Sequence, residues 1–147
     1  MRTSSTLSFI PSRRWDFFVL VTMASTVRSL IHMFALDGGA HSIVGLAINL
    51  EGGANLVALF AQWGASQLIL AVFYWLAIIR YRVLVPLMLL IVALEQALRI
   101  GVGHLKPIEA ATSPPGAYAS CAILPLALLA FVLSLKRSNR AGSLPAA

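Results

Sequence analysis

Charged residues are scarce in this sequence of 147 residues: they make up 11% of it, whereas hydrophobic residues make up 59%. A soluble domain usually carries about a quarter charged residues, so an ordinary water-soluble globule is excluded. The mean hydropathy of +0.87 equally excludes a disordered chain. The composition therefore predicts a small integral membrane protein that forms a single domain over residues 1–147.

Cysteine and the common catalytic motifs are almost absent. Cys121 is the only cysteine, so no intrachain disulfide can form, and no CxxC pattern is present. The three histidines lack the HxxxH and HxH spacings that would indicate a metal or haem site. P-loops, GxGxxG fingerprints and nucleophile elbows are missing as well. No metal site and no reaction type therefore follow from a motif.

Acidic residues are few: 5 Asp and Glu stand against 11 Lys and Arg, which gives a net charge of +6. In a soluble protein this excess would raise the question of nucleic-acid binding. Here the basic residues lie at the ends of apolar segments, where anionic lipid headgroups attract them. The charge therefore predicts a lipid bilayer as the partner and no nucleic acid.

Four apolar runs each approach or exceed the roughly 20 residues that a helix needs to cross a bilayer. They lie at about 15–36, 54–79, 83–103 and 117–135. The sequence therefore predicts an all-α fold, a polytopic bundle of four transmembrane helices. The tails, 1–12 and 138–147, are rich in Ser, Arg, Pro and Ala and are predicted to be mobile.

Basic residues gather at one set of span ends. Eight of the eleven precede the first span, lie between the second and third, or follow the fourth: Arg2, Arg13, Arg14, Arg80, Arg82, Lys136, Arg137 and Arg140. The opposite loops, 37–53 and 104–116, contain a single Lys or Arg, which is Lys106. Because positively charged loops remain cytoplasmic, we expect both termini in the cytoplasm.

The first outer loop is bracketed by Asp37-Gly38-Gly39 and Glu51-Gly52-Gly53 and has an apolar middle, Ile43 to Leu50. This middle is too short to cross a membrane. It favours a short interfacial or re-entrant helix over the mouth of the bundle, with the glycine pairs as joints. The alternative is that it extends the second span.

Several polar side chains lie within the spans, where an ionisable group costs about 2.5–3.5 kcal/mol near the centre. At a rise of about 1.5 Å per residue, these polar side chains fall into two layers. One layer lies roughly 12 Å below the outer ends of the spans, and the second lies about one helical turn nearer to those ends. The first layer contains Arg28, Gln62, Glu95 and Gln96, and the second contains His32, Asn55 and Arg99. Residues of this kind normally face a cavity or one another.

The spacing also places these side chains on stripes. Glu95 and Arg99 are four residues apart and can pair, and Asn55 and Gln62 share one face of the second span. We expect the stripes to face one another around a polar pocket in the outer half, roofed by residues 41–50. The alternative is that they are packing contacts only, since interhelical hydrogen bonds average about 0.6 kcal/mol.

The layout resembles the DoxX-like group of small four-helix bacterial membrane proteins. The likeness rests on Asp37-Gly38-Gly39, Glu51-Gly52-Gly53, the Arg80-Tyr81-Arg82 turn and the helix after it, and it covers about residues 15–135. The resemblance implies a bacterial inner-membrane protein, in a group sometimes associated with quinone-linked sulfur or redox partners. It implies no residue assignment in this sequence.

The polar layers favour a protein that binds an apolar molecule with a polar head, such as a quinone, lipid or terpenoid. Such a protein would act as an accessory subunit or a small enzyme. The predicted ligand-binding residues are Arg28, Asn55, Gln62, Gln96 and Arg99. Glu95 and His32 are predicted to move a proton, as the catalytic pair of an enzyme.

Two alternative functions stay open. One is a structural or assembly subunit without chemistry, acting as a homo-oligomer or with a membrane partner subunit. The other is a small proton-coupled transporter, which an intramembrane carboxylate favours. The inner halves of the third and fourth spans are almost purely apolar and offer such a transporter no polar path.

Overall fold

The computed structural model describes residues 9–108 and 114–141, and this part of the chain is all-helical, without strands. Its elements are α1 (Phe9–Phe34), α2 (Gly53–Ile79), the short 3-10 helix η1 (Arg82–Leu84), α3 (Val85–Leu105) and α4 (Pro115–Ala141). Four segments are long and apolar enough to cross a membrane: Trp15–Phe34, Gly53–Ile79, Arg82–Leu105 and Pro115–Leu135. The predicted bundle of four spans is confirmed, and every predicted boundary agrees within 2 residues.

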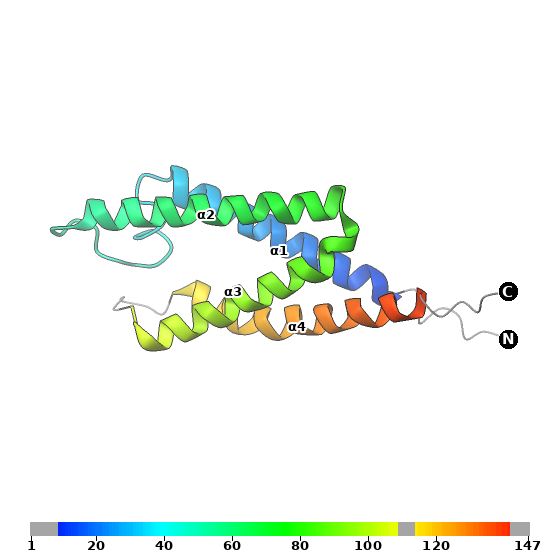
Figure 1. The fold of residues 1–147 in the computed structure, drawn as a ribbon. Helices are drawn as coiled ribbons and strands as arrows, with labels where there is room; N and C mark the ends of the chain where they lie inside the picture. Colours follow the sequence, from blue (N-terminus) through cyan, green and yellow to red (C-terminus); the bar gives the residue numbers. More distant parts are fainter. Residues whose placement is uncertain (1–8, 109–113, 142–147) are drawn as a thin grey trace, which may run out of the picture.

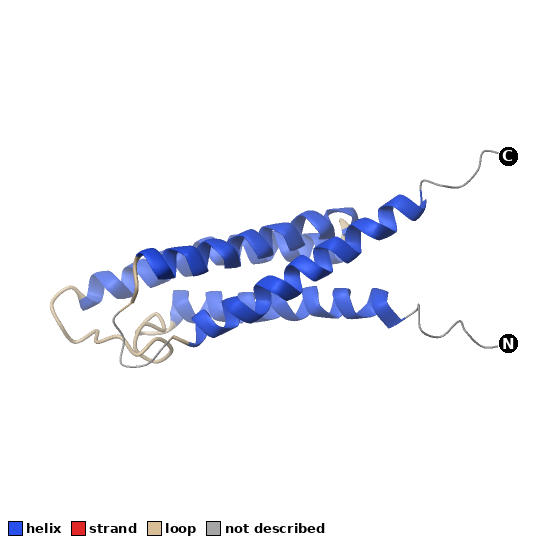
Figure 2. Cartoon of the chain, turned by 90° about the horizontal axis from the view of Figure 1, so that it is seen from below, coloured by secondary structure: helices blue, strands red, loops and turns tan. Residues whose placement is uncertain are grey.

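The helices form two antiparallel hairpins, in which α1 packs along α2 and α3 packs along α4 (Figure 1). Seen from below, α3 and α4 lie in front of α1 and α2, so the hairpins make two layers (Figure 2). Within the first hairpin the indole Nε1 of Trp75 donates a hydrogen bond of 3.1 Å to Oγ1 of Thr26. Close backbone contact between the hairpins is sparse, so side chains join them.

The two ends of the bundle differ in what they carry (Figure 1). The start of α1, the turn at η1 and the end of α4 lie together at one end, which we call the terminal end. Residues 35–52 and the end of α3 lie at the other, which we call the loop end. The basic turn, with Arg80 and Arg82, is thus at the terminal end, as the charge pattern predicts.

Buried apolar side chains fill the half of the bundle near the terminal end, and all four helices contribute to them. The cluster consists of Phe18, Val21, Tyr74, Ala77, Ile78, Val85, Met88, Leu89, Val92, Ala93, Ala127 and Ala130. The rings of Phe18 and Tyr74 meet edge to face, with centroids 5.6 Å apart. This cluster is the core that holds the two hairpins together.

The half near the loop end is packed much more sparsely. No residue of α3 from Ala97 onward is buried, and Ser120 is the one buried residue of α4 before Ala127. Large apolar side chains such as Leu98 and Val102 are exposed there, as lipid-facing residues of a membrane protein are. In this half, polar and aromatic side chains of α1, α2 and α3 take the place of an apolar core.

In the loop over residues 35–52, residues 36–44 form hydrogen-bonded turns and residues 45–48 have no regular structure, so the helix expected within Ile43 to Leu50 is not formed. The extension of α2 is also wrong, because α2 begins at Gly53. The physical reason is Gly45, whose φ of 76° ends the turn that starts at Gly39. The segment itself lies at the loop end, between α1 and α2, as predicted (Figure 1).

The predicted mobile tails lie mostly outside the described residues, which exclude 1–8 and 142–147. The inner parts of these tails are helical instead, since α1 begins at Phe9 and α4 ends at Ala141. The helices continue past the predicted spans because nothing in the polar flanking sequence stops them. Neither Pro11 nor Ser138 interrupts its helix.

Candidate functional site

The indole of Trp63, on α2, is the centre of the polar cluster near the loop end. The guanidinium carbon of Arg28, on α1, lies 5.1 Å from the centroid of this ring. The guanidinium carbon of Arg99, on α3, lies 4.6 Å from it. Both distances are within the range of cation–π attraction, which is strongest for tryptophan. Trp63 therefore gathers cations from two other helices and links the two hairpins.

Among the described residues, one carboxylate lies beside these cations. Oε1 of Glu95 accepts a hydrogen bond of 2.9 Å from Nε of Arg99, one turn along α3. The side chains of Arg99 and Glu95 are only 19% and 17% exposed. With Arg28 also charged, the cluster holds two positive charges against one negative. It therefore has an excess positive charge at membrane depth.

Both arginines keep hydrogen-bond donors that no protein group uses. Nε of Arg28 and Nη2 of Arg99 are buried and have no hydrogen-bond partner in the described part of the chain. A buried charged donor without an acceptor carries a large desolvation penalty. An anion or an electron-rich oxygen within reach of these donors would accept hydrogen bonds from them and balance the excess charge.

His32 lies beside the cluster and connects it to the loop. Its ring centroid is 5.0 Å from that of Trp63 and 5.4 Å from that of Phe60. Its Nδ1 lies 2.6 Å from the carbonyl oxygen of Gly38. Because a carbonyl only accepts hydrogen bonds, Nδ1 carries the proton in this contact. Nε2 is then the nitrogen left to exchange a proton.

The structure brings together four of the seven predicted site residues: Arg28, His32, Glu95 and Arg99. Gln96 is buried on α3, whereas Asn55 and Gln62 on α2 are exposed. The polar stripe of α2 thus points away from the other helices. Trp63 and Phe60 supply the α2 side of the site instead, and the sequence analysis missed both.

One feature of the sequence could have identified Trp63. Tryptophans of membrane proteins concentrate at the membrane interfaces. Trp63 instead lies ten residues inside α2, at the depth where Arg28 and Glu95 were placed on neighbouring spans. A tryptophan at the same depth as two arginines indicates a cation–π contact.

Glycine allows α1 and α2 to approach closely next to the site. A Cβ atom on Gly64 would lie 2.7 Å from Cβ of His32 and 3.0 Å from the backbone oxygen of Ser29. The first distance is shorter than real Cβ contacts, and the second is tight and involves backbone, which cannot move aside easily. The lack of a side chain on Gly64 therefore lets His32 lie close to α2, next to the preceding residue, Trp63.

The Asp37 carboxylate organises the start of the loop. Its Oδ2 accepts a hydrogen bond of 2.6 Å from the backbone N–H of Ser42, and its Oδ1 accepts one of 3.0 Å from that of Gly39. These two bonds, the one from Ser42 most, lower the pKa of Asp37 from 3.8 to about 2. The ordered turn holds the Gly38 carbonyl where His32 donates to it.

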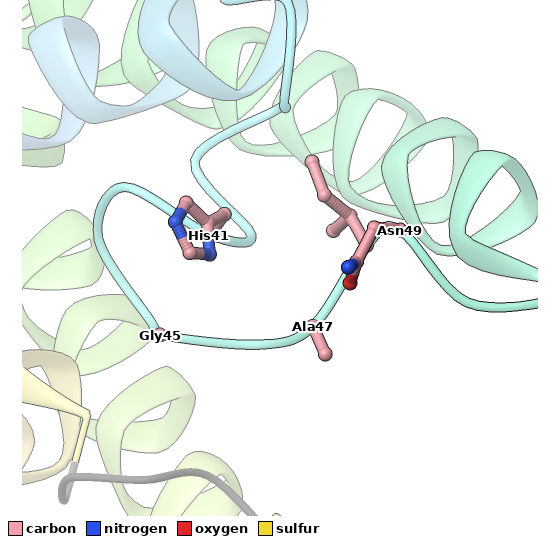
Figure 3. Close-up of a pocket in the computed structure, with 5 residues that line it drawn as sticks. His41, Gly45, Ala47 and Asn49 are labelled. Atoms are coloured by element: carbon pink, nitrogen blue, oxygen red, sulfur yellow. The ribbon is translucent and has the colours of Figure 1, made fainter.

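A separate open depression lies within the loop and is lined by loop residues alone (Figure 3). Its volume is about 340 Å³, and its lining residues are His41, Gly45, Ala47, Ile48 and Asn49. The His41 ring contacts the Leu46 carbonyl through Nδ1, at 3.1 Å. Within the described residues, no group of three His, Cys, Asp or Glu side chains lies close enough to hold a metal ion.

Comparison with known proteins adds no relative: no family model, no curated protein and no solved structure matches this chain. The resemblance to the DoxX-like group therefore stays a prediction based on the residues quoted for it. What the chain can do is argued from its own geometry.

Proposed function

We propose that this membrane protein binds an apolar molecule with an anionic or electron-rich head, such as a lipid, a quinone or a terpenoid. The head lies at Arg28 and Arg99 beside Trp63, and the apolar body lies along the sparsely packed loop half of α3 and α4. The observation that supports this is the pair of buried guanidinium donors without partners, with only Glu95 to balance two cations. The protein acts as an accessory subunit or a small enzyme.

Glu95 and His32 are the groups that can move a proton in such a site. Glu95 is held by Arg99, and His32 keeps Nε2 available beside Trp63. If the bound head is reduced, protonated or isomerised, these two side chains are the nearest acid and base. Asn55 and Gln62 have no part in this proposal, since both are exposed and point outward, and no hydrogen bond within the described residues joins the buried Gln96 to the arginines.

The test is the set of molecules that remain with the protein during purification in a mild detergent. Mass spectrometry of the extracted lipids should show one enriched class, and Arg28→Gln or Arg99→Gln should lower its amount several-fold. Arg82→Gln is the matched control, because its guanidinium also lies over a tryptophan, 5.0 Å from the Trp15 ring, but at the terminal end. Equal loss in all three variants, or no enriched class, would contradict the proposal.

The protein is also proposed to lie in the inner membrane of a bacterium, with both termini in the cytoplasm. The charge pattern and the position of Arg80 and Arg82 at the terminal end support this orientation. Labelling of single cysteines tests it on intact cells. A cysteine at Tyr81 should be protected from an impermeant reagent, and one at His41 should react; the reverse result would overturn the orientation.

A structural or assembly subunit is the second candidate function, because α2 exposes amide side chains at membrane depth. It predicts a stoichiometric partner and no lipid loss in the arginine variants. Transport is less well supported, because Phe18, Leu89 and Val92 are among the apolar side chains that fill the terminal half. They leave no polar path across that half.

A further inference from the structure

The exposed face of α2 differs from that of α4. On α4 the exposed side chains of the membrane-spanning part include Leu126, Leu129 and Val132, as expected for a surface against lipid. On α2 the exposed side chains include Asn55, Gln62 and Ser66. Amides are unfavourable against hydrocarbon because lipid tails offer no hydrogen-bond partner. The face of α2 therefore requires a polar surface opposite it.

Seven of the exposed positions of α2 follow a regular spacing. They recur at alternating steps of four and three residues along most of the helix: Asn55, Leu59, Gln62, Ser66, Ile69, Phe73 and Leu76. This is the heptad spacing of helices that cross at about 20° in a left-handed pair. We call these seven residues the α2 seam. At about 1.5 Å per residue the seam is roughly 32 Å long, enough to cross the bilayer core.

The amides of the seam are unused within the chain. The Ser66 hydroxyl donates to the backbone oxygen of Gln62 at 3.2 Å. The side-chain amides of Asn55 and Gln62 form no hydrogen bond within the described residues. Each amide therefore presents both a donor and an acceptor to whatever lies opposite.

We propose that a second copy of this chain docks on the α2 seam, with α2 against α2 about a two-fold axis along the membrane normal. All copies insert with the same topology, so two neighbouring α2 helices run parallel and present the same residues at the same depth. An amide pairs with another amide, because each both donates and accepts. Gln62 therefore meets Gln62 of the second copy, and Asn55 meets Asn55.

The absence of charged residues on α2 also supports a second copy of this chain as the partner at the α2 seam. α2 contains no Asp, Glu, Lys, Arg or His, so bringing two copies together opposes no like charges. The amides at the seam also fix the register, as a single polar residue does in a coiled coil. This dimer does not depend on binding of the ligand head, because the arginines that would bind the head reach Trp63 from α1 and α3.

Disulfide cross-linking in membranes tests the dimer directly. Cys121 is the only cysteine, so Cys121→Ser gives a background free of thiols. In that background Gln62→Cys and Leu59→Cys should cross-link to dimers under mild oxidation. Leu129→Cys, exposed on α4, is the matched control and should yield several-fold less dimer.

Two results would overturn the proposal. Stronger cross-linking through Leu129→Cys or the natural Cys121 would place the interface on α4. Cross-linking of Gln62→Cys to another protein, with no dimer of this chain, would show that the seam binds a different partner. Both substituted positions are exposed, so neither variant creates a cavity that would prevent folding.

A second measurement addresses the amides themselves. The dimer dissociation constant, measured by energy transfer between labelled copies in vesicles, should rise about threefold for each interhelical hydrogen bond lost. Gln62→Leu should therefore weaken the dimer at least that much, and the double variant with Asn55→Leu should weaken it further. Tyr118→Phe, which removes an exposed hydroxyl from α4, should leave it unchanged. An unchanged constant in the double variant would contradict the pairing of amides.

Discussion

In the terminal half of the molecule all four helices bury apolar side chains against one another, whereas in the loop half three helices meet through charged and aromatic ones. Leu89 and Phe18 are fully buried in the first half. In the second half, Arg28 and Arg99 lie against Trp63, and each has a buried hydrogen-bond donor without a partner in the described residues. The two halves share the same helices, so the difference comes from side chains alone.

The difference separates stability from function. A close-packed apolar half gains dispersion energy and holds the hairpins together without needing any ligand. A half with an uncompensated cation and unpaired donors is less stable than its neighbour unless something binds there. Residues that lower local stability in this way are typical of binding sites. The predictions below compare the two halves by substitution.

The largest effect is expected in the terminal half. Leu89→Ala leaves a cavity in the core and should lower the free energy of unfolding by about 3 kcal/mol, mostly from lost packing. Leu129→Ala, at a side chain 56% exposed, should change it by less than about 0.5 kcal/mol. Reversible unfolding in mixed micelles, followed by helicity, measures both. Similar losses would mean that the terminal half is not the stabilising core.

A smaller effect is expected where the halves meet, at Gly64. Gly64→Ala pushes α1 away from α2 and should lower the free energy of unfolding by about 2 kcal/mol. Gly101→Ala is the matched control: a Cβ there meets nothing within 4 Å, so better helix propensity should stabilise α3 slightly. The same micelle titration compares them. An unchanged free energy of unfolding in Gly64→Ala would show that the close contact at His32 does not constrain the two helices.

The next effect concerns the charges of the loop half. Glu95→Gln leaves two arginines on Trp63 without a counter-charge and should cost about 1–2 kcal/mol, below the cost at a fully buried pair because both side chains are partly exposed. Combining it with Arg99→Gln should recover part of the loss. Strict additivity with both Arg99→Gln and Arg28→Gln would show that these groups do not act together.

The sequence predicts the spans well because hydrocarbon allows few solutions: each span must be long, apolar and helical. It also predicts the depth of Arg28 and Glu95, since rise per residue is fixed. It does not predict which face of α2 packs against the other helices. Asn55 and Gln62 share a face in any helix, and only packing decides whether that face points to α1, to lipid or to another chain.

The contacts of Trp63 and the loop depend on details that periodicity does not contain. Gly64 lets α1 approach so closely that the Trp63 side of α2 faces the site. The loop forms turns rather than a helix because Asp37 binds the backbone of Ser42 and Gly45 takes a positive φ. These are local hydrogen bonds and backbone angles, which outweigh the apolar character of Ile43 to Leu50.

The smallest effect is expected in that loop and depends on pH. Because the folded pKa of Asp37 is about 2 and its ordinary value is 3.8, the carboxylate stabilises the turn fully above pH 4. This contribution is lost as the pH falls through 2, where the carboxylate is protonated and its hydrogen bonds to Ser42 and Gly39 weaken. The amide proton resonance of Ser42 should therefore titrate with a midpoint near 2. Asp37→Asn should abolish the titration, while Leu89 and the rest of the terminal half show no change. A midpoint near 4 would mean that the carboxylate is not held by these bonds.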